Sequence, residues 1–264
     1  LIVSANGRPV RSNEDLTAAI QAAGGAPLTV VYRRSGARHT ATLTPTADEN
    51  GHYKAGVWVR DSGAGIGTMS FVDPQRGTFA GLGHSISDAD TGADLTLLSG
   101  EIVPVTITGC IRGAAGSPGE LRGEFAAAPA GTVLANDAAG VYGSYTGNCT
   151  APALPVANLQ EVTPGEAELW TTVLGTTAQP YTIQVERVTM TGSDPNRNLL
   201  IRVTDKRLLD ATGGVVQGMS GSPIVQNGRL AAVLTHVLVN DPSRGYAIFA
   251  TTMLEKADAV ASSK

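Results

Sequence analysis

The strongest constraint on the fold of this chain is a succession of short apolar runs separated by turns rich in glycine and proline. Such runs recur from residue 56 onward, for example at 181–188 and 199–203. Asn227-Gly228, inside the apolar segment 223–230, is typical of a two-residue β-hairpin turn. The 32 glycines and 14 prolines leave few long stretches with helical periodicity. The pattern therefore predicts a mainly β domain, a barrel or a sandwich.

Further short strands are expected along the same part of the chain. They fall at 57–59, 69–72, 102–107, 169–174, 233–239 and 246–250, and a closing helix is expected over 253–261.

The first 45 residues have a different character. Residues 2–4 read as a strand, Ser12 followed by Asp15 resembles a capping box, and apolar side chains from Leu16 onward share one helical face. Gly24-Gly25 is expected to end this helix, with strands at 28–32 and 39–43 to follow. This order resembles the second half of a PDZ domain, without the half that carries the carboxylate-binding loop. We therefore expect three segments: a partial α/β PDZ-like module (1–45), a polar linker (46–55) and a main domain (56–264).

Composition excludes several classes of function. The net charge is −4 and no basic block is present, which argues against a nucleic-acid or anionic-membrane surface. No apolar run reaches the ~18 residues of a membrane span. Since the first residue is Leu1 and not Met, we expect the natural N-terminus, with any signal peptide or anchor, to lie upstream.

The segment Gly218-Met219-Ser220-Gly221-Ser222-Pro223 is the strongest candidate for chemistry. A serine hydroxyl attacks a carbonyl only if it is exposed, close to a base, and near N–H donors for the oxyanion. Glycines on both sides of Ser220 would let the backbone amides of Gly218 and Ser220 turn toward such a pocket. An ordinary turn between two strands is the alternative.

His84, which directly follows a glycine at the end of a short apolar run, is the candidate base. It lies far upstream of Ser220, as expected if a two-barrel serine peptidase carries its histidine on the first barrel and its serine on the second. Sequence spacing alone does not identify the acid that would orient the imidazole. The candidates are Asp88, Asp90, Asp94, Asp137 and Asp205.

The remaining motifs point to no cofactor. The histidines form no metal-spaced pair, so neither a metal nor another cofactor is expected. Cys110 and Cys149 are the only cysteines, and two cysteines in such a chain favour a single disulfide in an oxidising compartment over two buried thiols.

Several longer segments together resemble the SpoIVB peptidase family of sporulating bacteria. They are Arg60-Asp61-Ser62 with Gly65-Ile66-Gly67-Thr68-Met69, the segment 82–88 around His84, Thr204-Asp205-Lys206-Arg207-Leu208-Leu209, the segment 213–224 around Ser220, and Thr235-His236-Val237-Leu238-Val239-Asn240-Asp241-Pro242. The resemblance implies a PDZ-tethered, chymotrypsin-like serine endopeptidase with a double β-barrel. It also implies an exported enzyme that processes itself and cleaves a membrane-associated regulatory protein to release a sporulation signal.

Carried onto the matching positions, the resemblance makes Ser220 the nucleophile, His84 the base and Asp205 the acid. We expect the N–H groups of Gly218 and Ser220 to hold the oxyanion. The strand from Thr235 onward is the expected edge for an extended substrate, with His236 either beside the first specificity pocket or simply packed. The alternative functions are a catalytically silent barrel that binds peptides beside a PDZ module and, less well matched to the motif, an esterase.

Overall fold

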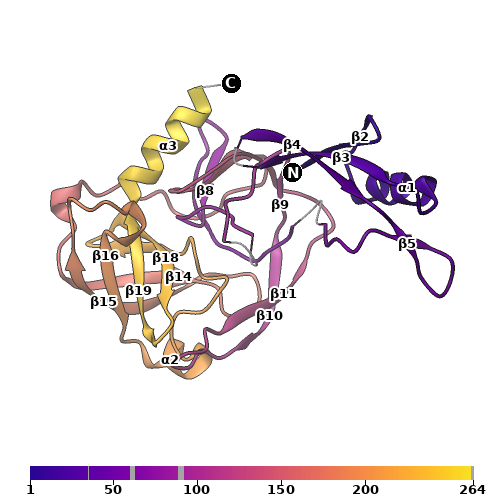
Figure 1. Cartoon of the computed structure of the whole chain (residues 1–264). Coiled ribbons are helices and arrows are strands. Elements are labelled where there is room, and N and C mark those ends of the chain that lie inside the picture. Colours follow the sequence, from indigo (N-terminus) through magenta and orange to yellow (C-terminus); the bar gives the residue numbers. More distant parts are fainter. Residues whose placement is uncertain (35, 60–62, 89–91, 263–264) are drawn as a thin grey trace. The chain divides into compact units, whose positions relative to one another are not determined.

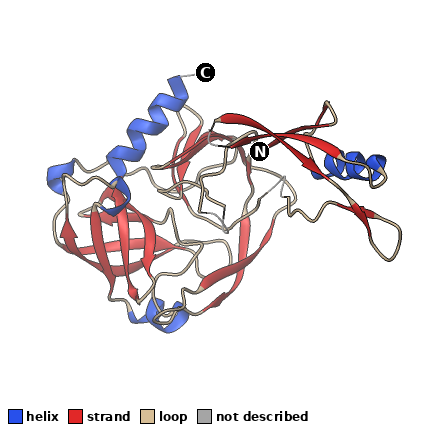
Figure 2. Cartoon of the chain, in the orientation of Figure 1, coloured by secondary structure: helices blue, strands red, loops and turns tan. Residues whose placement is uncertain are grey.

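The computed structural model describes residues 1–34, 36–59, 63–88 and 92–262. The chain divides into two compact units, Leu1–Ala64 and Gly65–Lys264. Strands predominate in the second unit, and none of the described helices is long and apolar enough to cross a membrane (Figure 2).

The first unit is a small sheet with one helix. Its elements are β1 (Ile2–Ala5), β2 (Arg8–Pro9), α1 (Asn13–Ala23), β3 (Leu28–Arg34), β4 (Ala37–Leu43), β5 (Thr46–Ala47) and β6 (Tyr53–Lys54). The sheet order is β2-β1-β3-β4, and β5 pairs with β6. Leu16 and Ile20 of α1 are buried in one cluster with Leu28 and Val30 of β3.

The local signals for α1 are confirmed. The Ser12 hydroxyl accepts a hydrogen bond from the Asp15 amide at 3.3 Å, which satisfies one of the free N–H groups of the first turn. Gly24 ends the helix in the left-handed region at φ 56°. The strands expected at 28–32 and 39–43 are β3 and β4.

The segment expected to be a linker contains the short pair β5–β6, and the boundary between the two units falls after Ala64. The strand expected at 57–59 was wrong, because Trp58 is fully exposed in irregular backbone and has no packing partner to favour an extended pair. Residues 60–62, part of one motif quoted above, lie outside the described residues.

The second unit begins with an open five-stranded sheet and a separate ribbon (Figure 1). The sheet has the order β7-β8-β13-β12-β9. The strands are β7 (Met69–Asp73), β8 (Thr78–Gly81), β9 (Glu101–Ile102), β12 (Gly131–Asp137) and β13 (Gly140–Tyr145), and the ribbon is β10 (Val105–Ile111) with β11 (Glu120–Phe125). Of these strands, the sequence predicted β7 and, merged into one, β9 with part of β10.

A closed barrel of order β14-β15-β16-β19-β18-β17 completes the second unit. Its elements are η1 (Leu159–Glu161), β14 (Gly165–Thr171), β15 (Gln179–Val188), η2 (Pro195–Arg197), β16 (Leu199–Val203), α2 (Lys206–Thr212), β17 (Pro223–Gln226), β18 (Arg229–Leu238), β19 (Asp241–Phe249) and α3 (Ala250–Ser262). Asn227 and Gly228 form the expected hairpin turn, both at positive φ (52° and 72°). The mainly β prediction is confirmed, with one barrel closed and the other half an open sheet.

One apolar core fills the closed barrel. It includes Leu169, Ile183, Ile201 and Leu234, all fully buried. A second cluster joins the two halves, because Met253 of α3 packs with residues of β8, β13, β18 and β19. These cores fix the ends of β8 and β18 with respect to each other, and the candidate site lies there.

Candidate active site

Ser220 lies in a tight turn that leads into β17. Gly218 and Gly221 on either side adopt φ values of 96° and 98°, which a residue with a side chain rarely accepts. A Cβ on Gly221 would also lie 1.9 Å from the carbonyl oxygen of Thr68. Met219 between them is fully buried in the barrel core and anchors the turn. The glycines expected from the sequence are therefore required by backbone geometry and by close packing.

The turn presents a half-buried hydroxyl whose hydrogen bond goes to the backbone. Ser220 Oγ donates to the carbonyl oxygen of Thr235 at 2.7 Å. The carbonyl oxygen of Ser220 accepts from the Thr68 amide at 2.8 Å, and Gly221 N–H donates to Leu234 at 2.8 Å. These bonds attach the nucleophile turn both to β18 and to the segment that precedes β7.

Two N–H groups of the turn are available to an anion. Within the described part of the chain, the amides of Gly218 and Ser220 donate to no protein acceptor. The carbonyl oxygen of Gly218 is instead held by the Thr68 hydroxyl at 3.1 Å. The two amides expected to form an oxyanion hole are thus unoccupied donors on the turn that carries the hydroxyl.

His84 follows a sharp turn at the end of β8. Leu82 and Gly83 both have positive φ, 67° and 69°. A Cβ on Gly83 would lie 2.9 Å from Thr235 Cγ2, so the backbone beside His84 packs directly on β18. The imidazole lies against the His236 ring, with 4.9 Å between ring centroids and an interplanar angle of 34°. Ser220 therefore bonds Thr235 of β18, and the ring of His84 lies against the next residue of that strand, His236.

The hydrogen bond of His84 defines its tautomer. Its Nδ1 lies 2.7 Å from the carbonyl oxygen of Ser85. Because a carbonyl oxygen can only accept, this bond requires the proton on Nδ1 and leaves Nε2 of the neutral ring as a proton acceptor. The hydroxyl of Ser220 and the ring of His84 are each bonded to backbone and not to one another.

The environment of His236 favours its neutral form. Loss of solvent around the ring lowers its pKa below the usual value of 6.5, and the positive charges that His84 and Arg197 can carry act in the same direction. Asp194 opposes them. A neutral His236 beside His84 adds no positive charge next to the candidate base.

Asp205 is not brought to this site. Leu200 of β16 lies in one row with His236 of β18, across β19. Asp205 follows the opposite end of β16, about 16 Å further along at ~3.3 Å per residue. There it begins α2, accepting from the amides of Arg207 at 2.8 Å and Thr182 at 3.3 Å. The Arg207 side chain, foremost among these partners, lowers its pKa to about 2.

The other aspartates offered by the sequence also have partners of their own. Asp94 accepts from the hydroxyls of Ser85 and Ser87, and Asp137 pairs with Lys256 at 3.4 Å. The backbone amide of Asp88 donates to Ala93, and Asp90 lies outside the described residues. Within the described residues, the hydrogen bond of the His84 ring goes to the Ser85 carbonyl and not to an aspartate.

Both cysteines are free thiols, so the disulfide favoured by the sequence was wrong. Cys110 is half-buried on β10, and Cys149 is exposed in the loop after β13. Burial, the main cause, raises the pKa of the Cys110 thiol.

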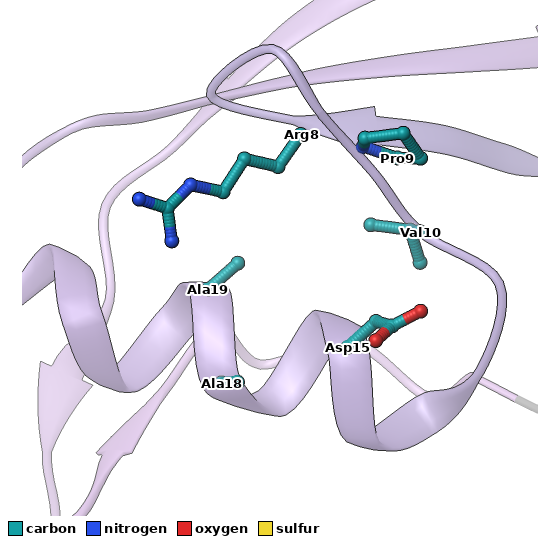
Figure 3. A pocket seen from close by; sticks show the side chains of 6 residues that line it. All are labelled: Arg8, Pro9, Val10, Asp15, Ala18 and Ala19. Atoms are coloured by element: carbon teal, nitrogen blue, oxygen red, sulfur yellow. The ribbon is translucent and has the colours of Figure 1, made fainter.

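A separate small pocket belongs to the first unit alone (Figure 3). Its cavity of about 170 Å³ lies between β2 and the first turns of α1. It is lined by Arg8, Pro9, Val10, Asp15, Ala18 and Ala19. None of the candidate catalytic residues contributes to it.

Sequence reasoning missed the groups that hold the nucleophile turn from a distance. Thr68 bonds both Gly218 and Ser220, and Leu121 of β11 bonds Gln217. These are mainly backbone contacts between segments far apart in the chain, which no local residue pattern announces.

The sequence matches the model of the SpoIVB peptidase S55 family over residues 51–254. No protein of the curated collection matches it. Among solved structures, the inactive form of the Rv3671c protease shares 15% identity at a TM-score of 0.36, with 54% of this chain and 72% of that chain covered. The active form of the Rv3671c protease from M. tuberculosis shares 16% identity at a TM-score of 0.37, with 60% of this chain and 79% of that chain covered. The HtrA-type protease AlgW with a decapeptide shares 13% identity at a TM-score of 0.38, with 74% of this chain and 62% of that chain covered.

Proposed function

The chain belongs to the SpoIVB peptidase family and is a serine peptidase, and we propose that it cleaves peptide bonds through an acyl-enzyme formed on Ser220 with His84 as the general base. The observation that supports this assignment is that Ser220 and His84 contact adjacent residues of β18, Thr235 and His236 respectively. A protein or peptide is the substrate.

In the proposed reaction, Nε2 of His84 takes the proton of Ser220 as Oγ attacks the substrate carbonyl carbon. The hydroxyl must first leave the carbonyl of Thr235, since its single proton cannot be donated to two acceptors. The amides of Gly218 and Ser220 receive the oxyanion. The imidazolium then gives its proton to the leaving amine, and water with the same base hydrolyses the ester.

The carbonyl of Ser85 performs one task usually given to the triad acid in this scheme. It holds the proton on Nδ1 and so keeps Nε2 free to act as base. Asp205, the acid that the family resemblance implies, is not used in this scheme. Thr235 and His236 remain the proposed edge for an extended substrate, because β18 continues past the nucleophile to Leu238.

A fluorophosphonate probe tests the assignment directly, because it phosphonylates only an activated serine. We expect one adduct, located on Ser220 by peptide mapping, and none in Ser220→Ala. Ser222→Ala is the matched control, since this serine lies in the same turn but is fully buried, and its labelling should equal that of the wild type. A folded wild-type protein without any adduct would leave the silent peptide-binding barrel as the better function. An adduct that survives Ser220→Ala would refute Ser220 as the nucleophile.

We extend the proposal to the setting that the family suggests. The enzyme would be exported and would act outside the cytoplasm, in the intermembrane space of a developing spore. It would cleave a regulatory protein of sporulation signalling and would process itself. Self-processing is tested by intact-mass measurement of the full chain and of Ser220→Ala after incubation, because only the active protein should yield fragments.

A further inference from the structure

The β10–β11 ribbon belongs by sequence to the first half of the second unit, but it lies on the closed barrel. Ile107 of β10 exchanges two backbone hydrogen bonds with Gly175, which lies between β14 and β15, each at 2.8 Å. At the ribbon tip, Gly113 N–H donates to the carbonyl of Thr212 at 2.8 Å. The Arg112 guanidinium donates to carbonyls at the C-terminal end of α2. Figure 1 shows the ribbon running down to α2.

The ribbon also contacts the segment that enters the nucleophile turn. Leu121 N–H donates to the carbonyl of Gln217 at 2.8 Å, and Gln217 N–H donates to the carbonyl of Gly119 at 2.8 Å. Glu120 and Gln217 form a parallel bridge. Gly119, directly before β11, and Leu121 of β11 therefore hold Gln217 by its amide and its carbonyl respectively.

This contact determines where one oxyanion donor points. The carbonyl of Gln217 and the N–H of Gly218 belong to the same peptide group. In a planar trans peptide these two groups point in opposite directions. Because the Gln217 oxygen is bound to Leu121, the Gly218 N–H must point away from the ribbon, and a rotation of this peptide would require breaking that bond.

The side chain of Leu121 supports the same peptide by packing. It is 6% exposed and shares the barrel core with Met219. A Cβ on Gly218 would lie 3.1 Å from Leu121 Cβ and 3.3 Å from its Cδ1. Gly218 therefore rests directly on this side chain.

We infer that Leu121 is a positioning residue of the oxyanion hole, acting through the peptide between Gln217 and Gly218. This inference rests on the proposed function of Ser220. It adds that a residue of the β10–β11 ribbon, which belongs by sequence to the first half of the unit, orients an oxyanion-hole N–H group of the closed barrel.

Two variants separate the contributions of Leu121. Leu121→Pro removes its N–H, and that N–H is already directed at Gln217 and not at Cys110, the opposite residue of β10. Leu121→Ala keeps the N–H and removes the packing on Gly218. Leu230→Ala is the control, since Leu230 is 8% exposed, loses the same atoms, and bonds Pro155 and Ala157 instead of the 217–218 peptide.

The measurement is the second-order rate of Ser220 phosphonylation by the fluorophosphonate probe, together with the melting temperature of each full-length variant. Loss of one oxyanion donor slows catalysis by about 100-fold or more, so we expect that loss for Leu121→Pro and an intermediate loss for Leu121→Ala. Leu230→Ala should label within about threefold of the wild type even where its melting temperature falls as far as that of Leu121→Ala. The boronic-acid form of a peptide substrate should lose affinity for Leu121→Ala while the matching product peptide does not, a difference that a purely structural role would not produce.

The labelling results distinguish failure of the proposed function from failure of the Leu121 inference. A wild type that is not labelled at Ser220 refutes the proposed function. A labelled wild type with Leu121→Ala and Leu230→Ala labelled at equal rates refutes the positioning role, and this comparison decides even if Leu121→Pro does not fold.

Discussion

Asp205 provides the sharpest test of the active-site geometry, because structure and family resemblance give it different tasks. In the structure its carboxylate accepts from the amides of Arg207 and Thr182 and from the Arg207 guanidinium at 2.7 and 3.1 Å. These contacts begin α2 and attach it to β15. The perturbation is the replacement Asp205→Asn, which keeps a capping side chain and removes the charge, beside Asp205→Ala, which removes both.

The pKa of Asp205 determines how much stability the substitution should cost. A fall from 3.8 to about 2 corresponds to about 2 kcal/mol in favour of the ionised form in the folded protein. Since the Arg207 side chain is largely exposed to solvent, about half of that is a more suitable value. We therefore expect Asp205→Asn to cost about 1 kcal/mol and to lower the melting temperature by about 2–4 °C. Asp205→Ala, which also loses the helix cap, should cost about 2–3 kcal/mol.

The pH dependence follows from the direction of the shift. A carboxyl whose folded pKa is depressed stabilises the fold above its unfolded pKa, and this stabilisation is lost as the pH falls through the folded value. The stability difference between wild type and Asp205→Asn should therefore be constant from neutral pH to about 4 and should disappear between about 4 and 2.

The assay combines thermal unfolding with fluorophosphonate labelling of the folded protein. We expect Asp205→Asn to label Ser220 within about threefold of the wild type, because its carboxylate lies far from His84. Removing the charge of a triad acid instead costs about 10⁴ in kcat. A folded Asp205→Asn protein with an unchanged melting temperature and a labelling rate lower by a thousandfold or more would refute this reasoning and restore Asp205 as the acid.

Three further outcomes are expected. Gly221→Ala should be strongly destabilised and unlabelled, because its Cβ would lie 1.9 Å from the Thr68 carbonyl oxygen at a φ of 98°; a stable, active variant would contradict the packing described. A thiol reagent should modify Cys149 rapidly and Cys110 slowly, because burial raises the pKa of the Cys110 thiol; a native protein with no titratable thiol would show a disulfide instead. The lowered pKa of His236 means that the unfolded chain binds a proton first on acidification, so stability should fall below about pH 6.5; His236→Gln should show a shallower decline, and an unchanged slope would exclude this source.

The sequence predicted local structure well where a residue type has one conformational use. Ser12 and Gly24 marked the ends of α1, and Asn227-Gly228 marked the β17–β18 turn, because caps and positive φ depend on neighbours in sequence. The strands β11, β12 and β13 were missed. Their burial is set by partners far along the chain, as when Val141 of β13 pairs with Gly81 of β8, so their own patterns are weak.

The candidate site divides in the same way. Ser220 and His84 could be named from their flanking glycines and from a family pattern, and in the structure they contact the adjacent β18 residues Thr235 and His236 respectively. The positions of Asp205 and Leu121 depend on strand register and on the path of the ribbon. A sequence motif predicts neither of these positions, since residues that are close in one motif can lie at opposite ends of a strand.

The resting contact between Ser220 and Thr235 bears on which feature limits the rate. A neutral hydrogen bond of this kind contributes about 1 kcal/mol net, so releasing the hydroxyl toward His84 costs about a factor of five in reactivity. A misdirected oxyanion donor costs about 100-fold or more. Release of the serine hydroxyl therefore has a small free-energy cost, and the orientation of the Gln217–Gly218 peptide, held by Leu121, has the larger influence on whether the site can react.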